Sequence, residues 1–136
     1  MSVMRRSEDH FTLITAAAAQ WHDFEMLSRS LTQGLSLIDI TTEYGTLIVT
    51  GPKSRDLFHS LNTEADLETN WLTHQKAKIK DIECSLVRVS FAGELGWEIH
   101  ALNKDIAALY EFSIAAGAKP FGMWALNSLR IEKGYR

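Results

Sequence analysis

The sequence contains one cysteine, no excess of positive charge and no long apolar run. Because Cys84 has no second thiol to pair with, the chain has neither an internal disulfide nor a thiolate metal cluster, which is typical of a reducing compartment. The formal net charge of −3 gives no electrostatic support for nucleic-acid binding. No segment has the length and apolarity of a membrane span, and no signal-peptide core follows Arg5 and Arg6. We therefore predict a cytoplasmic protein that contacts neither nucleic acid nor membrane.

Other kinds of site also lack a sequence signature. The five histidines are far apart and none has a partner four residues away, so we predict no metal site. A glycine-rich phosphate loop is missing, since Gly93 and Gly96 fall between two predicted strands. We find no FAD-binding motif. Cys84 lies in a predicted strand and fits a small buried apolar residue better than a nucleophile.

The chain is long enough for one core. Its 136 residues are 46% hydrophobic, and no repeat, low-complexity tract or linker rich in glycine, serine or proline divides them. We therefore predict a single domain, residues 1–136.

Local patterns predict strands and helices in alternation. The predicted strands cover residues 11–15, 35–40, 46–50, 78–91 and 97–101, and the predicted helices cover residues 16–34, 52–61, 103–117 and 123–133. Gly34 and Gly117 are expected to end two of these helices, and Asn103 to cap one. Short strand-to-strand turns make antiparallel neighbours. The pattern thus predicts an α+β fold, an antiparallel sheet with helices packed on it.

The first candidate for ligand binding is the turn from Phe91 to Glu98. Gly93 and Gly96 flank Glu94 there, at the tip of a predicted hairpin. A carboxylate in this position can accept two parallel hydrogen bonds from a flat ligand with adjacent N–H donors, such as a pterin. The alternative is a solvated surface glutamate, which the pattern alone favours.

Two more segments offer candidate side chains. Arg130 stands between apolar neighbours late in the last predicted helix and can hold an anionic group with its planar fork of donors. Its alternative, which the pattern alone favours, is to reach solvent or to bond the last helix carbonyls. Tyr44, in the polar turn 41–45, can stack on a flat ligand; an exposed turn tyrosine is the favoured alternative.

Two longer strings resemble a known family. Residues 88–100 (RVSFAGELGWEIH) and 120–136 (PFGMWALNSLRIEKGYR) resemble the folate domain of dimethylglycine dehydrogenase, sarcosine dehydrogenase and dimethylglycine oxidase, which is related to the aminomethyltransferase of glycine cleavage, the T-protein. Residues 11–24 and 44–54 match as well, so the resemblance covers nearly the whole chain. It implies ferredoxin-like elements and a tetrahydrofolate cofactor. By the resemblance, Glu94 hydrogen-bonds the pterin ring and Arg130 belongs to the same pocket. Phe91 supplies an apolar wall where family members commonly have tyrosine.

The resemblance also implies parts that these residues do not include. In the family, a one-carbon unit released as an iminium by a flavin half passes to a folate nitrogen, assisted by an aspartate upstream of the matched region. We expect a partial T-protein-like domain without that aspartate and without an FAD site, and catalysis by this chain stays open. One hypothesis is a tetrahydrofolate-binding fragment of one-carbon metabolism, completed by a flavin dehydrogenase partner chain or by self-association. The other is a non-catalytic remnant that acts as a binding module, as a homodimer.

Overall fold

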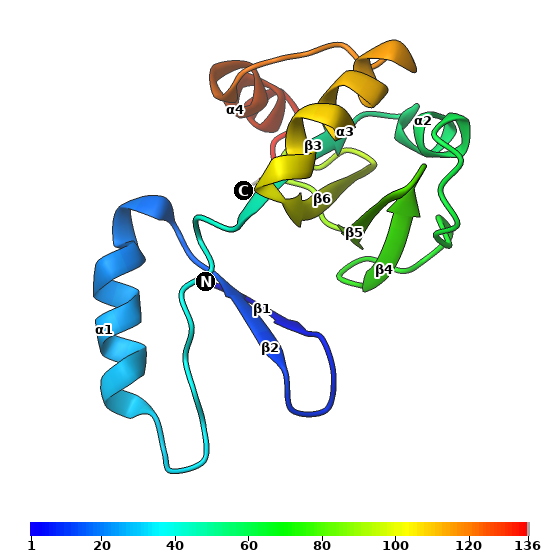
Figure 1. Ribbon diagram of the computed structural model, residues 1–136. Coiled ribbons are helices and arrows are strands. Elements are labelled where there is room, and N and C mark those ends of the chain that lie inside the picture. The colour runs from blue at the N-terminus through cyan, green and yellow to red at the C-terminus, as the bar shows by residue number, and fades with distance from the viewer. Residues whose placement is uncertain (136) are drawn as a thin grey trace. The chain divides into compact units, whose positions relative to one another are not determined.

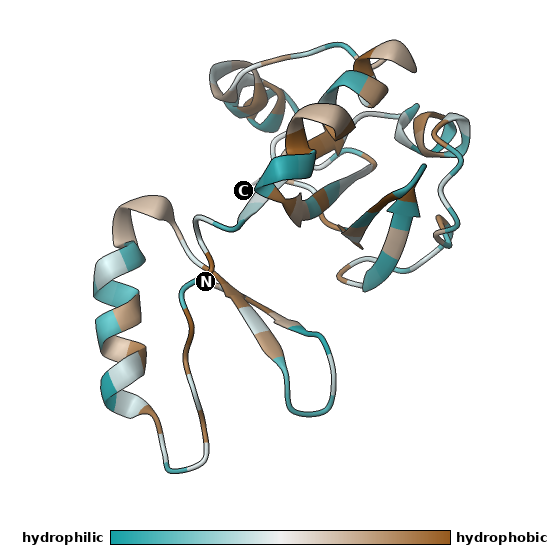
Figure 2. Ribbon diagram, viewed as in Figure 1, coloured by the Kyte–Doolittle hydropathy of each residue, from teal (hydrophilic) through white to brown (hydrophobic). Residues whose placement is uncertain are grey.

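The computed structural model describes residues 1–135, which form two compact units, Met1–Ile40 and a second that begins at Thr41. In the first unit, β1 (Ser2–Arg5) and β2 (Phe11–Ile14) form an antiparallel hairpin in which Ser2 lies opposite Ile14 (Figure 1). The hydrophilic residues between these strands form its connection (Figure 2). A 3-10 turn, η1 (Ala17–Ala19), then leads into α1 (Gln20–Ser30). β1 was not expected, because four residues are too few to show a period.

Two expectations for this unit need correction. The helix predicted to run to Gly34 ends at Ser30, and Gly34 instead lies in a turn closed by the Leu35 N–H and the Thr32 carbonyl, 3.2 Å apart. The strand predicted at residues 35–40 is wrong. That segment is irregular, and Leu35 and Ile38 are 64% and 72% exposed. A strand needs a neighbour for its backbone groups, and this segment has none among residues 1–135.

The second unit is a four-stranded antiparallel sheet with helices packed on it. The elements are β3 (Tyr44–Thr50), α2 (Ser54–Ser60), β4 (His74–Ile79), β5 (Ile82–Val87), β6 (Gly96–Leu102), α3 (Asn103–Ala115) and α4 (Met123–Glu132). The strands lie in the order β3-β6-β5-β4, and α3 packs on β3 and β6 (Figure 1). The α+β prediction is confirmed. Among residues 1–135, none of the helices combines the length and the apolar character that a bilayer crossing requires.

The core of this unit lies between the sheet and the helices. Trp97 and Ile99 of β6 are fully buried, because alternate residues of a strand point to the same face. Leu86 of β5, Phe58 of α2 and Leu109 of α3 pack against them. The same packing fixes β6, the strand that follows the Glu94 turn.

The connection from β5 to β6 is longer than the sequence pattern predicts. β5 ends at Val87 and does not continue to Phe91, so residues 88–95 form an irregular loop. The register of β4 with β5 ends in an irregular pairing: the Arg88 N–H donates to the Thr73 carbonyl at 2.8 Å, and the Leu72 N–H donates to the Arg88 carbonyl at 2.9 Å, so that two residues lie opposite one. The pairing of β5 with β6 also ends at Val87, opposite Glu98.

The helix ends test two sequence predictions, that glycine ends α3 and that Asn103 caps its start. Gly117 and Gly134 both have positive φ, and the N–H groups that follow them bond back into the helices, from Ala118 to Ser113 and from Tyr135 to Arg130, each at 3.0 Å. The predicted end of α3 is thus confirmed. The Asn103 cap is wrong, because the Asn103 side chain donates to the Thr42 carbonyl at 2.6 Å and the capping position is Leu102.

Candidate functional site

The Glu94 turn packs against the C-terminal end of α4. Ala92 is fully buried, and Gly93 has φ +75°. A β-carbon added at Gly93 would lie 3.0 Å from the Tyr135 ring and 3.1 Å from Lys133, so both the backbone angle and the space favour glycine. The first glycine of the turn therefore lets the loop approach α4 closely.

Glu94 is held by an ion pair at this contact. Its Oε1 accepts from Lys133 Nζ at 3.0 Å, and the two side chains are 35% and 50% exposed. An ion pair so open to solvent adds at most about 1 kcal/mol to stability. Among residues 1–135, Oε2 of Glu94 has no partner. The pair thus orients the carboxylate and leaves one oxygen available.

Arg130 lies beside the same turn. Its guanidinium carbon is 5.3 Å from the centre of the Phe91 ring, within the range of a cation–π contact. Its Nε is buried and has no hydrogen-bond partner in the part of the chain that the structure describes. Lys133 caps the C-terminal end of α4 in a helical conformation, three residues after Arg130, so the two side chains share a face. Glu94, Phe91 and Arg130 are therefore brought together by one helix end and one loop.

Arg88 belongs to the same loop, although the sequence analysis did not single it out. Its Nη1 donates to the Gly96 carbonyl at 3.1 Å, which joins the two ends of the loop, and its guanidinium lies 4.8 Å from the Trp97 ring. Its Nε, like the Ser90 hydroxyl, is buried without a partner among the described residues. The available signal was a charged residue between Val87 and Val89 in a strand-like run.

Tyr44 lies elsewhere in the fold. It begins β3 opposite Leu102, whereas the Glu94 turn joins β6 at Gly96, which lies opposite Thr50. Six residues of strand separate these two ends, or roughly 20 Å at about 3.3 Å per residue. The structure therefore groups three of the four candidate residues and leaves Tyr44 at the far end of the strand.

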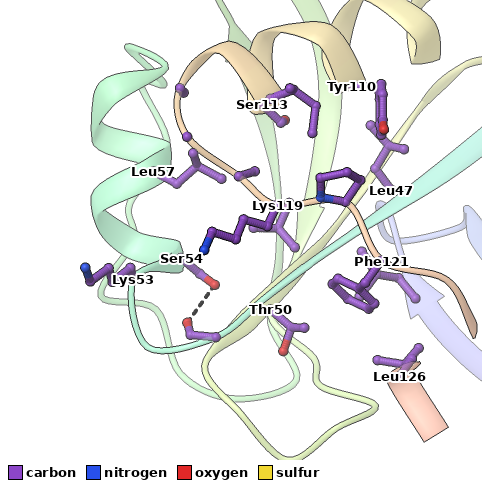
Figure 3. A pocket seen from close by; sticks show the side chains of 18 of the residues that line it. Leu47, Thr50, Lys53, Ser54, Leu57, Tyr110, Ser113, Lys119, Phe121 and Leu126 are labelled. Atoms are coloured by element: carbon purple, nitrogen blue, oxygen red, sulfur yellow. Dashed lines mark hydrogen bonds between the residues drawn. The ribbon is translucent and has the colours of Figure 1, made fainter. Parts of the chain in front are cut away.

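A cavity of about 1030 Å³ lies between β3, α2 and the segment that joins α3 to α4 (Figure 3). None of the four candidate residues lines it. The sequence analysis gave no sign of it, because its walls come from segments far apart in the chain. Within residues 1–135 there is also no group of three His, Cys, Asp or Glu side chains that could hold a metal ion.

Cys84 is buried in β5, and burial raises the pKa of its thiol from 9.0 to about 11. The unfolded chain therefore loses this proton first, and the thiol's contribution to stability falls as the pH rises from about 9 to 11. We expect the free energy of unfolding of the wild type to drop by about 2 kcal/mol more than that of Cys84→Ala over this range. Urea titrations of both proteins at pH 9 and pH 11 measure this difference. An equal drop in the free energy of unfolding for the wild type and Cys84→Ala would contradict it.

Comparison with known proteins identifies the family. The family model described as GCVT N-terminal domain matches residues 1–136, and the chain belongs to this family. The chain is 36% identical to dimethylglycine dehydrogenase, mitochondrial, of Rattus norvegicus, with 100% of this chain and 17% of that protein covered. It is 32% identical to sarcosine dehydrogenase, mitochondrial, of Mus musculus, with 93% and 15% covered. The predicted family resemblance is confirmed.

The chain is also similar to an aminomethyltransferase in sequence and to a solved sarcosine oxidase in fold. Aminomethyltransferase of Listeria monocytogenes serotype 4a is 28% identical, with 96% of this chain and 36% of that protein covered. A chain of heterotetrameric sarcosine oxidase from Corynebacterium sp. U-96, solved with pyrrole 2-carboxylate, has a TM-score of 0.69 at 19% identity, over 88% of this chain and 63% of that one. At that identity the likeness shows the fold. The chain thus spans about a sixth of the dehydrogenases and about a third of the aminomethyltransferase.

Proposed function

We propose that the Glu94 turn and the end of α4 form part of a tetrahydrofolate site in an aminomethyltransferase-like domain. The observation that carries the proposal is the grouping of Glu94, Phe91 and Arg130 within one loop and one helix end. Tetrahydrofolate supplies a nitrogen nucleophile that accepts a one-carbon unit. The residues present fit such a ligand because they combine a carboxylate, an aromatic face and a guanidinium.

Each of the three side chains has a distinct role in this proposal. The free Oε2 of Glu94, together with Oε1, accepts hydrogen bonds from the amino edge of the pterin, while Lys133 keeps the carboxylate in place. Phe91, 43% exposed, offers a ring face. Arg130 Nε, buried without a partner among residues 1–135, donates to an electron-rich or anionic part of the ligand. Tyr44 has no part in this cluster, and a stacking role for it rests on the sequence pattern alone.

Isothermal titration with tetrahydrofolate tests the proposal, and Arg130→Lys makes the test specific. Lysine keeps the charge and loses the planar fork, so we expect binding about tenfold weaker than in the wild type. Arg29→Lys is the matched control, because Arg29 lies on α1 in an exposed ion pair with Glu25. Absence of binding heat in the wild type, or equal affinity of wild type and Arg130→Lys, contradicts the proposed site.

A second candidate function is a self-associating binding module. Its support is the exposed apolar surface of α4, where Met123, Trp124 and Ile131 are 62%, 89% and 71% exposed. We propose that this surface is covered in a homodimer or by a flavin-dependent partner chain; the sarcosine oxidase named above is heterotetrameric. Light scattering after size exclusion should give twice the chain mass for the wild type and the single mass for Trp124→Glu. A single chain mass for the wild type would contradict the homodimer.

The cellular location stays a prediction. The proposal of a cytoplasmic location rests on the single cysteine. The rat and mouse dehydrogenases are named as mitochondrial proteins. Cell fractionation with an antibody against the chain decides between the two compartments.

A further inference from the structure

β3 is an edge strand with one side unpaired. It bonds to β6 on its other side, in a register that runs from Tyr44 opposite Leu102 to Thr50 opposite Gly96. Just beyond the two ends of β3, Gly51 N–H bonds the Leu95 carbonyl at 2.7 Å and Asn103 N–H bonds the Glu43 carbonyl at 2.8 Å. Because hydrogen-bonded pairs alternate along antiparallel strands, odd-numbered residues of β3 face β6.

The even-numbered residues of β3 therefore direct their backbone N–H and C=O groups away from the sheet. They are Tyr44, Thr46, Ile48 and Thr50, of which the last three line the cavity, and no backbone hydrogen bond reaches them from outside the sheet among residues 1–135. Edge strands are usually protected by charges, prolines or bulges. The β3 sequence YGTLIVT has no charge and no proline, and its register with β6 is unbroken. This edge thus has the features of a strand that pairs with another strand.

The cavity runs along this edge. Its lining includes every residue from Thr46 to Thr50 on one side, and Tyr110 and Ile114 of α3 with Phe121 on another. Figure 3 shows β3 as one wall and the segment after α3 as the opposite rim. Its volume of about 1030 Å³ is at the upper end of the range for small-molecule pockets, and its walls follow a strand. A linear ligand fits this shape better than a compact one.

The chemistry of the walls sets the character of that ligand. Leu47 and Val49 point to the core face, on the side of α3. A strand added at this edge would place alternate side chains against Tyr110, Ile114 and Phe121, so alternate residues should be apolar. At the α2 end, Lys119 extends toward Ser54 (Figure 3). The charged side chains of the lining are Lys53, Lys119 and Asp56, which leaves one net positive charge.

We propose that the outer edge of β3 binds an extended polypeptide segment of a partner, which adds to the sheet beside β3. This segment has apolar residues at alternate positions and an acidic residue near the Thr50 end. Main-chain hydrogen bonds to Thr46, Ile48 and Thr50 supply affinity, and the cavity selects the alternate side chains. The cavity lining includes none of Phe91, Glu94 and Arg130, so the inference stands whether or not folate binds.

The test uses a capped heptapeptide, Glu-Val-Thr-Val-Thr-Val-Glu, and nuclear magnetic resonance of the full chain. Two matched peptides carry N-methyl groups on all the threonines or on all the valines. Successive N–H groups of a strand point to opposite sides, so only one of the two can still donate to β3. We expect the unmethylated peptide to slow hydrogen exchange at Thr46, Ile48 and Thr50, and one methylated peptide to bind at least about tenfold more weakly than the other.

Ile48→Pro is the matched variant of the protein. It removes an outward N–H without touching a bond to β6, and proline is tolerated at the outer side of an edge strand. We expect at least about a tenfold loss of peptide affinity, whereas Glu83→Gln, at an exposed position of β5, keeps wild-type affinity. Equal binding of both methylated peptides, or no binding of any peptide, overturns the proposal. So does protection of the three amides without peptide in a dimer, because β3 would then pair with a second copy.

Discussion

Trp97→Ala should lower the free energy of unfolding by about 3–5 kcal/mol, the largest effect expected from a single change in this chain. Trp97 is fully buried in β6, and its ring meets that of Phe58 edge-on with centroids 5.2 Å apart. The Arg88 guanidinium also lies over the Trp97 ring, 4.8 Å from its centroid. Alanine leaves a cavity at the point where sheet, α2 and the 88–95 loop meet, and surrounding side chains only partly fill it.

Urea unfolding measures this loss, with Trp124→Ala as the matched control. Trp124 is 89% exposed on α4, so its removal should change the free energy of unfolding by less than about 0.5 kcal/mol. Equal effects of the two substitutions would show that β6 is not the centre of the core.

Glu94→Gln should weaken tetrahydrofolate binding by about 100-fold. The carboxylate offers two acceptor oxygens to the paired N–H groups of the pterin, whereas the amide offers one acceptor and one donor. A donor facing a donor leaves a buried polar group unpaired, which costs about 1–3 kcal/mol on top of the lost charge-assisted bond. The fold should be unaffected, because the ion pair with Lys133 is largely open to solvent.

The matched control is Glu83→Gln. Glu83 lies on β5 with an 85% exposed side chain, and its Oε1 is 4.0 Å from Lys78 Nζ. Calorimetric titrations of both variants and the wild type give the comparison. An affinity of Glu94→Gln within twofold of the control would remove Glu94 from the site.

Much of the fold was predictable because its signals are local. Alternating burial marks β6, glycines with positive φ end α3 and α4, and short connections give an antiparallel sheet. The failures come from interactions between distant residues. The segment 35–40 has the composition of a strand but no partner strand among residues 1–135. Regular pairing of β5 ends at Val87, because both Thr73 and Leu72 bond to Arg88.

The candidate site was predictable only in part, for the same reason. Glu94 and Arg130 stand out in the sequence, but their proximity depends on how α4 packs against the 91–95 loop. Lys133 ends the last predicted helix, and its pairing with Glu94 is a tertiary contact. Tyr44 was suggested by residue type, and its distance from the cluster follows from the β3–β6 register. The cavity beside β3 has no linear signature at all.

Mapping of amide chemical shifts on addition of tetrahydrofolate tests the central claim most directly. The account predicts saturable shifts confined to residues 91–96 and to the last turn of α4, around Arg130 and Lys133. Shifts centred instead on the cavity residues 46–54 and 113–126, or no shifts at saturating ligand, would contradict it.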